Sequence, residues 1–523
     1  MSSILQLAGH ALALYVGWRL LRWNLYKSPL DNTPGVANHS LIAGNIEAMF
    51  HPRAGWAFVK KVIEYGRVST IHGSFGAKVL FTFDPRAFHA IYLKDQDVYE
   101  ESDIFISIFG LCLGPGLLST LGEQHRRQRK MLNPLFSAKH LRGMTLIFTN
   151  IVHKLENAIS SRVKDGAQEL DVLNWMGRAA LELIGQGGLG YSFDPLTEDV
   201  ADDLLIHVFP SAVQSQLNTV VRMILHILHM MRISDNLTAR SLKIVSDKKD
   251  ALQQGDAALK QQVGEGKDIM SVLLRENMRA AEADRLTDEE VVAQVSTLVL
   301  AATDTTSNAL ARIFHQLCLH PDVQQRLREE IIQARDDGTG KLRDLDYDEV
   351  MELPFLDAVC RETMRRFPPV TGLMRIVRRD AILPLSAPIR GVDGAMIDAI
   401  PVKEGTYIVT SVQACNTNKE LWGPDADEWR PERWLNPLPR AVEEAHIPGV
   451  YSHLMTFVGG ARACIGFKFA QLEMKVVLAM LLPAFSFELT DKPIEWNCAG
   501  VAYPSVGESF KPEMPLRVTR IDV

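Results

Sequence analysis

Residues 457–466 read FVGGARACIG, and this stretch decides how the rest of the chain is interpreted. It holds Cys464, the one cysteine of six that follows two glycines and an arginine so closely. Gly459 and Gly460 permit a bend in which backbone amides approach a ligand, and an apolar helix is expected to begin at Cys464. The positive end of that helix and the neighbouring Arg462 both favour a thiolate. A thiolate in such a bend suits iron, although an inert buried cysteine explains the residue equally well.

The composition limits the classes of protein to consider. A chain of 523 residues with 47% hydrophobic and 23% charged residues can form a large packed core and is not globally disordered. Its net charge of -7 argues against a nucleic-acid partner. The six cysteines are scattered without a CxxC pair, so neither a structural zinc site nor a disulfide framework is indicated. A reducing compartment fits best.

Residues 4–21, ILQLAGHALALYVGWRLL, are the candidate membrane segment. The run is slightly shorter than the roughly 20 residues that a span needs. Because Arg22 and Lys27 follow it, the rest of the chain is expected to face the cytosol. We predict a membrane anchor over residues 1–27 and a proline- and glycine-containing linker over 28–50. An amphipathic helix lying on the membrane surface is the alternative.

The remaining residues, 51–523, are predicted to form one domain. Helical periodicity dominates between residues 84 and 367, with one of the expected helices at 198–215. Short strands are expected near 67–83 and 376–413, and a further helix at 464–482. The sequence therefore predicts a mainly α fold with a small β-rich lobe.

Two other stretches place charged groups on predicted helices. In AATDTT, residues 301–306, an acid and a hydroxyl (Asp304 and Thr305) lie in a long apolar helix, which is costly unless they are used or satisfied. In CRETMRR, residues 360–366, Glu362 and Arg365 have the i, i+3 spacing of an ordinary helical ion pair. Neither stretch identifies a function by itself.

A third stretch is basic. GEQHRRQRK, residues 122–130, has five basic residues in six positions, a pattern that most often marks a solvated helix face.

Together these stretches resemble one family. Phe457, Gly460, Arg462, Cys464 and Gly466 match in full the haem-binding pattern FxxGxRxCxG of the cytochrome P450 family. The sequence is similar to that family over essentially its whole length, and the other motifs follow in the family's order. The resemblance implies the cytochrome P450 fold, a haem b cofactor and Cys464 as the axial ligand of its iron.

The resemblance also assigns roles to the other motifs. It implies that Asp304 and Thr305, as a hydrogen-bonded pair, relay protons to iron-bound oxygen. The family's usual glycine is Ala302 here, whose methyl group narrows the oxygen groove. The resemblance further implies a structural ion-pair network of three residues, Glu362, Arg365 and Arg433.

The haem propionates are expected to meet a set of basic side chains. In the family's WxxxR pattern the tryptophan is His125 here and the arginine is Arg129; the other expected contacts are Arg375 and Arg462. The remaining cations of this region are Arg126, Arg127, Lys130 and Lys468, and they are candidates for docking an acidic electron-transfer partner or for a solvated face. That partner is expected to be NADPH–cytochrome P450 reductase, with cytochrome b5 as a possible second one.

By the same resemblance the substrate pocket is lined by the loop 103–116, the helix near residue 300, and residues 370–374 and 499–507. The pocket positions are Ser107, Leu298, Ala302, Thr371, Leu373 and Tyr503. Core packing explains each of these equally well. Because these stretches carry few charges, a lipophilic small molecule is the expected substrate.

The sequence thus predicts a haem-thiolate monooxygenase, similar to fungal microsomal members, in the endoplasmic reticulum membrane with its catalytic domain in the cytosol. Analogy with those members favours a terpenoid or another secondary metabolite as substrate. The alternatives are an isomerase, dehydratase or peroxygenase of the same fold, and a haem-binding sensor without turnover. A cysteine hydrolase using His453 is a further, weaker one. The substrate and the position and number of oxidations are not encoded in any motif.

Overall fold

The computed structural model describes residues 9–10, 14–15, 17–18, 28–197, 219–255, 258 and 262–521. Most of the predicted membrane segment, residues 4–21, and all of the predicted helix at 198–215 lie outside this part of the chain. Among the helices that are described, none combines the length and the apolar character that a bilayer crossing requires. The described residues form two compact units, one made of residues up to Glu100 with Leu373–Ser411, and one made of Glu101–Gly372 with Val412–Val523.

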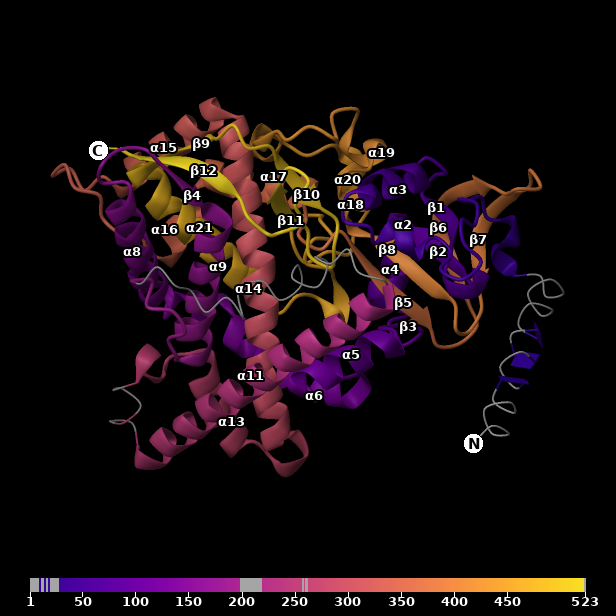
Figure 1. Ribbon diagram of the computed structural model, residues 1–523, viewed down its shortest axis with the longest axis horizontal. Helices are drawn as coiled ribbons and strands as arrows, with labels where there is room; N and C mark the ends of the chain where they lie inside the picture. Colours follow the sequence, from indigo (N-terminus) through magenta and orange to yellow (C-terminus); the bar gives the residue numbers. More distant parts are fainter. Residues whose placement is uncertain are drawn as a thin grey trace. The chain divides into compact units, whose positions relative to one another are not determined.

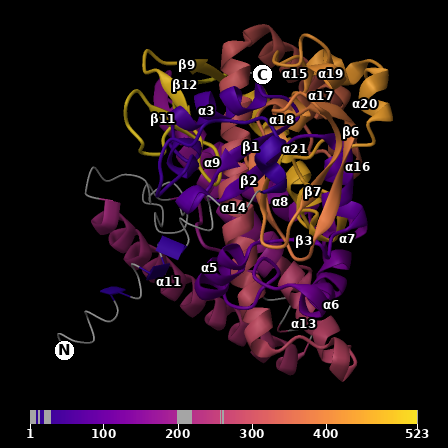
Figure 2. The same cartoon turned by 90° about the vertical axis from the view of Figure 1, so that its right-hand side faces the viewer.

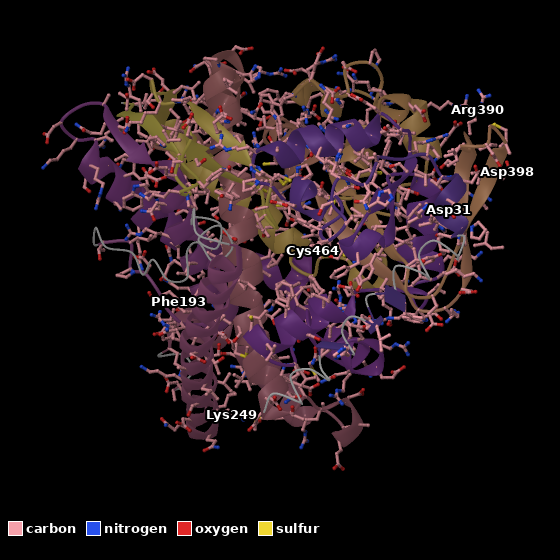
Figure 3. All side chains as sticks on the ribbon, turned by 45° about the vertical axis from the view of Figure 1, so that its right-hand side comes forward. Asp31, Phe193, Lys249, Arg390, Asp398 and Cys464 are labelled. Carbon is pink, nitrogen blue, oxygen red and sulfur yellow. The ribbon has the colours of Figure 1, made fainter. Side chains whose placement is uncertain are left out.

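The first unit is the strand-rich part that the sequence predicts. Its five-stranded sheet has the order β1-β2-β8-β5-β3, in which β1 and β2 are antiparallel and β2 and β8 are parallel. A separate hairpin joins β6 to β7, and Arg390 and Asp398 mark it in Figure 3. The strands are β1 Val68–His72, β2 Lys78–Thr82, β3 Tyr99–Glu100, β5 Gly372–Val377, β6 Ala381–Arg390, β7 Met396–Val402 and β8 Tyr407–Ser411.

Short helices accompany these strands. They are η1 Pro29–Asn32, α2 Ile46–Met49, α3 Ala54–Ile63, η2 Ser74–Gly76, α4 Pro85–His89 and η3 Ala90–Lys94. Helix α4 begins where Asp84 accepts hydrogen bonds from the backbone amides of Arg86 and Ala87 and where Pro85 occupies the first helical turn. The sheet's centre is apolar, since Leu80 and Ile408 are fully buried.

The second unit is mainly helical and is organised around α14, Asp288–Leu319. Thr287 and Glu290 form a capping box that starts this helix. Figures 1 and 2 show α14 as a long helix of this unit, and it packs against α9, α11, α17 and α21. Because most of its side chains are buried, α14 places the residues of the AATDTT stretch inside the unit.

The other helices of this unit surround α14. They are α5 Asp103–Leu113, α6 Gly122–Leu132, η4 Asn133–Phe136, α7 Ala138–Arg142, α8 Thr145–Arg162, α9 Val172–Leu183, η5 Ile184–Leu189, α11 Thr219–Gln254, η7 Val263–Gly266, α13 Ile269–Arg279, η8 Glu282–Asp284, α15 Pro321–Arg335, α16 Tyr347–Glu352, α17 Pro354–Arg366, α18 Val412–Asn416, α19 Lys419–Trp422, η9 Pro431–Leu435, α20 Arg440–Glu444, η10 Gly460–Arg462 and α21 Phe467–Ala484. One continuous apolar cluster, running from Leu113 to Val518, forms the core.

Two small sheets complete the second unit. One has the order β4-β12-β9 and the other is the hairpin β10-β11. Their bounds are β4 Gln168–Asp171, β9 Phe485–Leu489, β10 Ile494–Asn497, β11 Tyr503–Val506 and β12 Pro515–Arg520. Antiparallel pairing of β12 with β4 and β9 joins the end of the chain to residues near 170.

Two local predictions are wrong. The stretch 103–116, expected as a loop, contains helix α5, because the side chain of Ser102 caps the amide of Phe105 and the helix continues until Gly114, whose φ is +77°. The C-terminal helix begins at Phe467 and not at Cys464, with Gly466 as the residue before its first turn. Cys464 therefore lies in the loop ahead of the helix.

Candidate functional site

The Cys464 loop is shaped by backbone contacts. The backbone amide of Cys464 donates a hydrogen bond to the carbonyl of Phe457 at 2.9 Å. Gly460, with φ +71°, begins the single turn η10 that leads to Arg462. A Cβ atom at Gly459 would lie 1.6 Å from the carbonyl oxygen of Pro448, so the loop closes with backbone against backbone.

Residue Cys464 is exposed, and Figure 3 labels it within the second unit. Nevertheless, desolvation by the surrounding protein raises the pKa of the thiol, while the amide of Gly466 and the cation of Arg129 act to lower it. The expectation that the loop alone favours a thiolate is wrong for this structure, since desolvation is the largest cause. A coordinating metal ion removes a thiol proton outright.

Gly466, two residues after Cys464, has open space beside it. A Cβ atom at Gly466 would meet nothing within 4 Å, so the protein's own packing does not require this glycine of the motif. Phe457 lies 5.3 Å from Tyr451 and 6.3 Å from Phe467, measured between ring centroids. These aromatic contacts fix the start of the loop.

Arg462 leaves the loop and contacts residues on both sides of α5. Its Nε is 2.9 Å from Oε2 of Glu101, and its two terminal nitrogens donate to the carbonyls of Leu117 at 3.1 Å and Thr120 at 2.6 Å. Sequence reasoning missed Glu101. The predicted propionate contact of Arg462 thus coincides with an existing contact to a protein carboxylate.

Two further predicted residues come from α6. Arg129 donates to the carbonyl of Ala463 at 2.5 Å, so it contacts the residue next to Cys464. His125 is 6% exposed. Burial, followed by the charge of Arg462, lowers the pKa of His125 to about 4. The imidazole is therefore neutral at pH 7 and retains one N–H donor. The structure gathers His125, Arg129 and Arg462 around the Cys464 loop.

On α14 the two predicted catalytic side chains take different directions, because neighbouring residues of a helix are about 100° apart. Asp304 is 1% exposed, whereas Thr305 is half-buried. The hydroxyl of Thr305 donates to the carbonyl of Ala301 at 2.8 Å, so its hydrogen is not directed at Asp304, and the hydrogen-bonded pair stays a prediction. The side-chain amide of Asn308 lies 2.8 Å from the Asp304 carbonyl and 3.5 Å from its Oδ1.

The accessible positions of this part of α14 are few. Ala301 is exposed and Ala302 and Thr305 are half-buried, while the residues between 306 and 314 are buried. The helix continues through Ala302 without interruption. These small side chains provide an accessible strip in the middle of an otherwise buried helix.

The predicted ion-pair network of Glu362, Arg365 and Arg433 forms between α17 and η9 in the second unit. Arg365 contacts both carboxylate oxygens of Glu362 at 2.8 Å, and Nε of Arg433 is 3.4 Å from Oε1. Glu362 and Arg365 are fully buried. The indole of Trp434 and the backbone amide of Arg430 also donate to Glu362, each at 3.0 Å.

The predicted pocket residues differ in exposure. Ser107 is exposed, Ala302 and Thr371 are half-buried, and Leu298 is 6% exposed. Tyr503 is fully buried, and its hydroxyl donates to the carbonyl of Phe510. The structure therefore describes Ser107, Ala302 and Thr371 as accessible, and places Leu298 and Tyr503 in the core.

Arg375 and Leu373 belong to the first unit. Arg375 is 4% exposed, and its guanidinium lies 5.0 Å from the ring of Tyr92. Tyr92 in turn contacts Thr410 at 2.6 Å, and Thr410 donates to the carbonyl of Leu373 at 3.1 Å. These contacts connect Arg375 to Leu373 through Tyr92 and Thr410 within the first unit.

The donor set fits a haem group. Cys464 offers one soft ligand on an exposed residue, and Gly466 adds no side chain to the loop that follows it. Arg129 and Arg462 supply cations and His125 a neutral donor, which suits a group that carries carboxylates. Among the described residues, no cluster of three or more histidine, cysteine or acidic side chains could hold a metal ion instead.

The fold defines the class of protein first. The chain superposes on a crystal structure of a cytochrome P450 (CYP102L1) with a TM-score of 0.72 at 20% identity, covering 95% of this chain and 100% of that one. This likeness shows a shared fold.

Sequence comparisons then establish the family. Residues 55–507 match the cytochrome P450 family. Cytochrome P450 monooxygenase 91 of Postia placenta is 48% identical over 531 residues, which are 97% of each chain. Ganoderic acid synthetase CYP5150L8 of Ganoderma lucidum is 47% identical over 544 residues, covering 99% of this chain and 98% of the relative. The chain belongs to the cytochrome P450 family. It is accordingly an oxidoreductase whose family uses a haem-thiolate iron, a redox partner and lipophilic substrates.

Proposed function

We propose that this protein is a haem-thiolate monooxygenase that inserts one atom of O2 into a lipophilic small molecule. The observation that carries the proposal is the exposed Cys464 in a glycine-shaped loop, with Arg129 and Arg462 beside it. The cofactor is haem b, bound through Cys464. When bound, it supplies the iron that activates oxygen.

Side chains of α14 provide the proton-delivering groups and leave room for the substrate. Thr305 directs its hydroxyl hydrogen to Ala301, so its oxygen lone pairs are available to accept a hydrogen bond from a proton donor. Asp304, buried one position earlier, is the proton source of the pair, acting through a route that does not need a direct contact with Thr305. Ala301 and Ala302 add little bulk, so a substrate can approach this part of α14.

The substrate is a terpenoid or another secondary metabolite. The name of the Ganoderma lucidum relative, a ganoderic acid synthetase, supports this class. Helix α5 exposes Ile104, Ile108 and Leu111 at helical spacing, and such an apolar surface is compatible with contact to a lipophilic molecule.

Electrons come from an NADPH-dependent reductase, with cytochrome b5 as a possible second donor. Helix α6 offers this partner a basic face: Arg126 and Lys130 are exposed, and their ion pairs with Glu123 and Asp284 are surface pairs that a partner's carboxylates can replace. The chain is anchored in the endoplasmic reticulum membrane by residues 4–21, with residues 51–523 in the cytosol. A variant without residues 1–27 that remained fully in the membrane fraction would contradict this anchor.

The central experiment is the CO difference spectrum of the reduced protein. We expect the strongly red-shifted Soret band of thiolate ligation, and its loss in Cys464→Ser with Cys112→Ser as the matched control. Retention of the band in Cys464→Ser would refute the proposed ligand. Expression with a reductase in a microsomal host, followed by comparison of metabolites, then identifies the substrate. With that substrate, Thr305→Ala is expected to consume NADPH without forming an equivalent amount of product.

A further inference from the structure

One guanidinium holds both ends of the segment that contains α5. Arg462 pairs with Glu101, two residues before α5, and donates to the carbonyls of Leu117 and Thr120, which follow it. The Cys464 loop is thereby fastened to residues 101–120 through a single side chain. Because the three contacts use different nitrogen atoms, they can form at the same time.

The ion pair lies in a shielded region. The side chain of Glu101 is 10% exposed and that of Arg462 is 18% exposed. Charges in such surroundings interact more strongly than surface charges and are less screened by salt. The charge on Glu101 is therefore felt by its neighbours even at high ionic strength.

Glu101 offsets the positive charge of this region. Arg129 and Arg462 are the cations beside the loop, and His125 is neutral at pH 7. Arg129 contacts the carbonyl of Ala463, the residue before Cys464, and Arg462 contacts Glu101, so charged side chains extend from Glu101 to the Cys464 loop. Without Glu101 this group would carry one more positive charge at the site where the iron gains an electron.

We propose that Glu101 is a positioning residue that acts through Arg462, compensates its charge and keeps the midpoint potential of the bound iron low. Reduction adds one negative charge to the iron site, and a fixed negative charge nearby opposes it. This inference rests on the proposed function, because it requires that Cys464 binds a haem iron.

The competing explanation is that Glu101 only fixes the start of α5. It follows β3 directly and precedes the capping residue Ser102, so a purely structural role is reasonable. The two explanations differ in what they predict for a substitution. A structural role changes the thermal stability and leaves the potential of the folded protein unaltered, whereas a charge effect changes the potential.

The test is a potentiometric titration of the full-length holoprotein. We compare wild type, Glu101→Gln and Glu101→Asp with Glu123→Gln, which removes the same charge from an exposed pair on α6. For Glu101→Gln we expect a more positive midpoint potential, equivalent to a roughly three- to tenfold larger equilibrium constant for reduction. The shift is expected to persist at 1 M salt. Glu101→Asp retains the charge and should stay close to wild type.

Each outcome decides between the explanations. An unchanged potential in Glu101→Gln, with a normal CO spectrum, would refute the inference and leave the proposed function intact. An equal shift in Glu123→Gln, or a shift that salt abolishes, would also refute it, because it would show a general charge effect. Absence of the red-shifted CO band in wild type would instead refute the proposed function. If Glu101→Gln does not fold, Arg462→Gln removes the opposite charge of the pair and should shift the midpoint potential to more negative values; an unshifted Arg462→Gln overturns the inference.

Discussion

Two buried groups of acidic and basic side chains contrast within the helical unit. In the network around Glu362, Arg365 forms a bidentate pair with the carboxylate and donates to the carbonyls of Asn416, Ala426 and Glu428. Every nitrogen of Arg365 is used, and the side chain is fully buried. In the cluster around Arg462, by contrast, the guanidinium is 18% exposed and makes three contacts, with Glu101, Leu117 and Thr120.

This difference separates a structural group from a binding group. A charge network whose donors and acceptors are all occupied can hold segments together but cannot accept a ligand. The Arg462 cluster is less completely buried, and it includes a neutral imidazole and a second arginine at the Cys464 loop. The exposed fraction of the arginine side chain, 0% for Arg365 and 18% for Arg462, therefore distinguishes the two groups.

The largest expected loss of stability comes from a substitution that breaks the network around Glu362. Glu362→Gln places an amide NH2 against the donors of Arg365 and Arg433 and leaves their charges buried, so we expect a loss of about 3–5 kcal/mol in the free energy of unfolding. Chemical denaturation of the full chain measures it. The matched control is Glu444→Gln, which breaks an exposed pair with Arg440 and should cost less than about 0.5 kcal/mol. Comparable losses in both variants would break the comparison.

An intermediate loss of stability is expected at low pH, because His125 in the Arg462 cluster becomes protonated. The unfolded chain protonates His125 near its ordinary pKa of 6.5, whereas the folded chain does so only at about 4. Protonation therefore favours unfolding as the pH falls from 6.5 to 4, by at most ~1.4 kcal/mol per pH unit.

The measurement is the denaturation midpoint at several pH values for wild type and His125→Gln. The variant should lose less stability over this range, and the exposed His39→Gln should behave as wild type. Parallel pH curves for wild type and His125→Gln would show that the cluster tolerates a charged imidazole.

The smallest effect is expected for Glu101→Gln. Glutamine can still accept a hydrogen bond from Nε of Arg462, and the guanidinium keeps its two carbonyl partners. We therefore expect a loss of about 1 kcal/mol, well below that of Glu362→Gln, in the same denaturation experiment. If Glu101→Gln lost as much stability as Glu362→Gln, the Arg462 cluster would contribute as much to folding as the Glu362 network. The distinction between the two groups would then fail.

Much of the fold was predictable because the strongest signals are local. The periodic run after residue 286 predicts α14, and the bend in FVGGARACIG predicts a loop before a helix. The Glu362–Arg365 spacing predicts an ion pair on one helix, but its third member, Arg433, is brought in by tertiary folding that spacing cannot show. The resemblance to the family supplied that residue.

The rest of the site depends on contacts that no local pattern encodes. Glu101 and Arg462 are far apart in sequence, and the only signal near Glu101 is an acid placed directly before an apolar run. That run has apolar residues on nearly all sides, so its periodicity is weak and α5 was interpreted as a loop. The roles of Asp304 and Thr305 were assigned as a pair, although adjacent positions on a helix point in different directions.

The close backbone contacts before Cys464 have a consequence for directed evolution of this enzyme. A side chain at Gly449 or Gly459 would collide with a backbone carbonyl at less than 2 Å, so nearly every member of a library randomised at these positions should be inactive. The accessible residues of α5, such as Ile104, Ile108 and Leu111, have no such constraint. Variation is therefore better tolerated on the exposed face of α5, and the two glycines are best kept fixed.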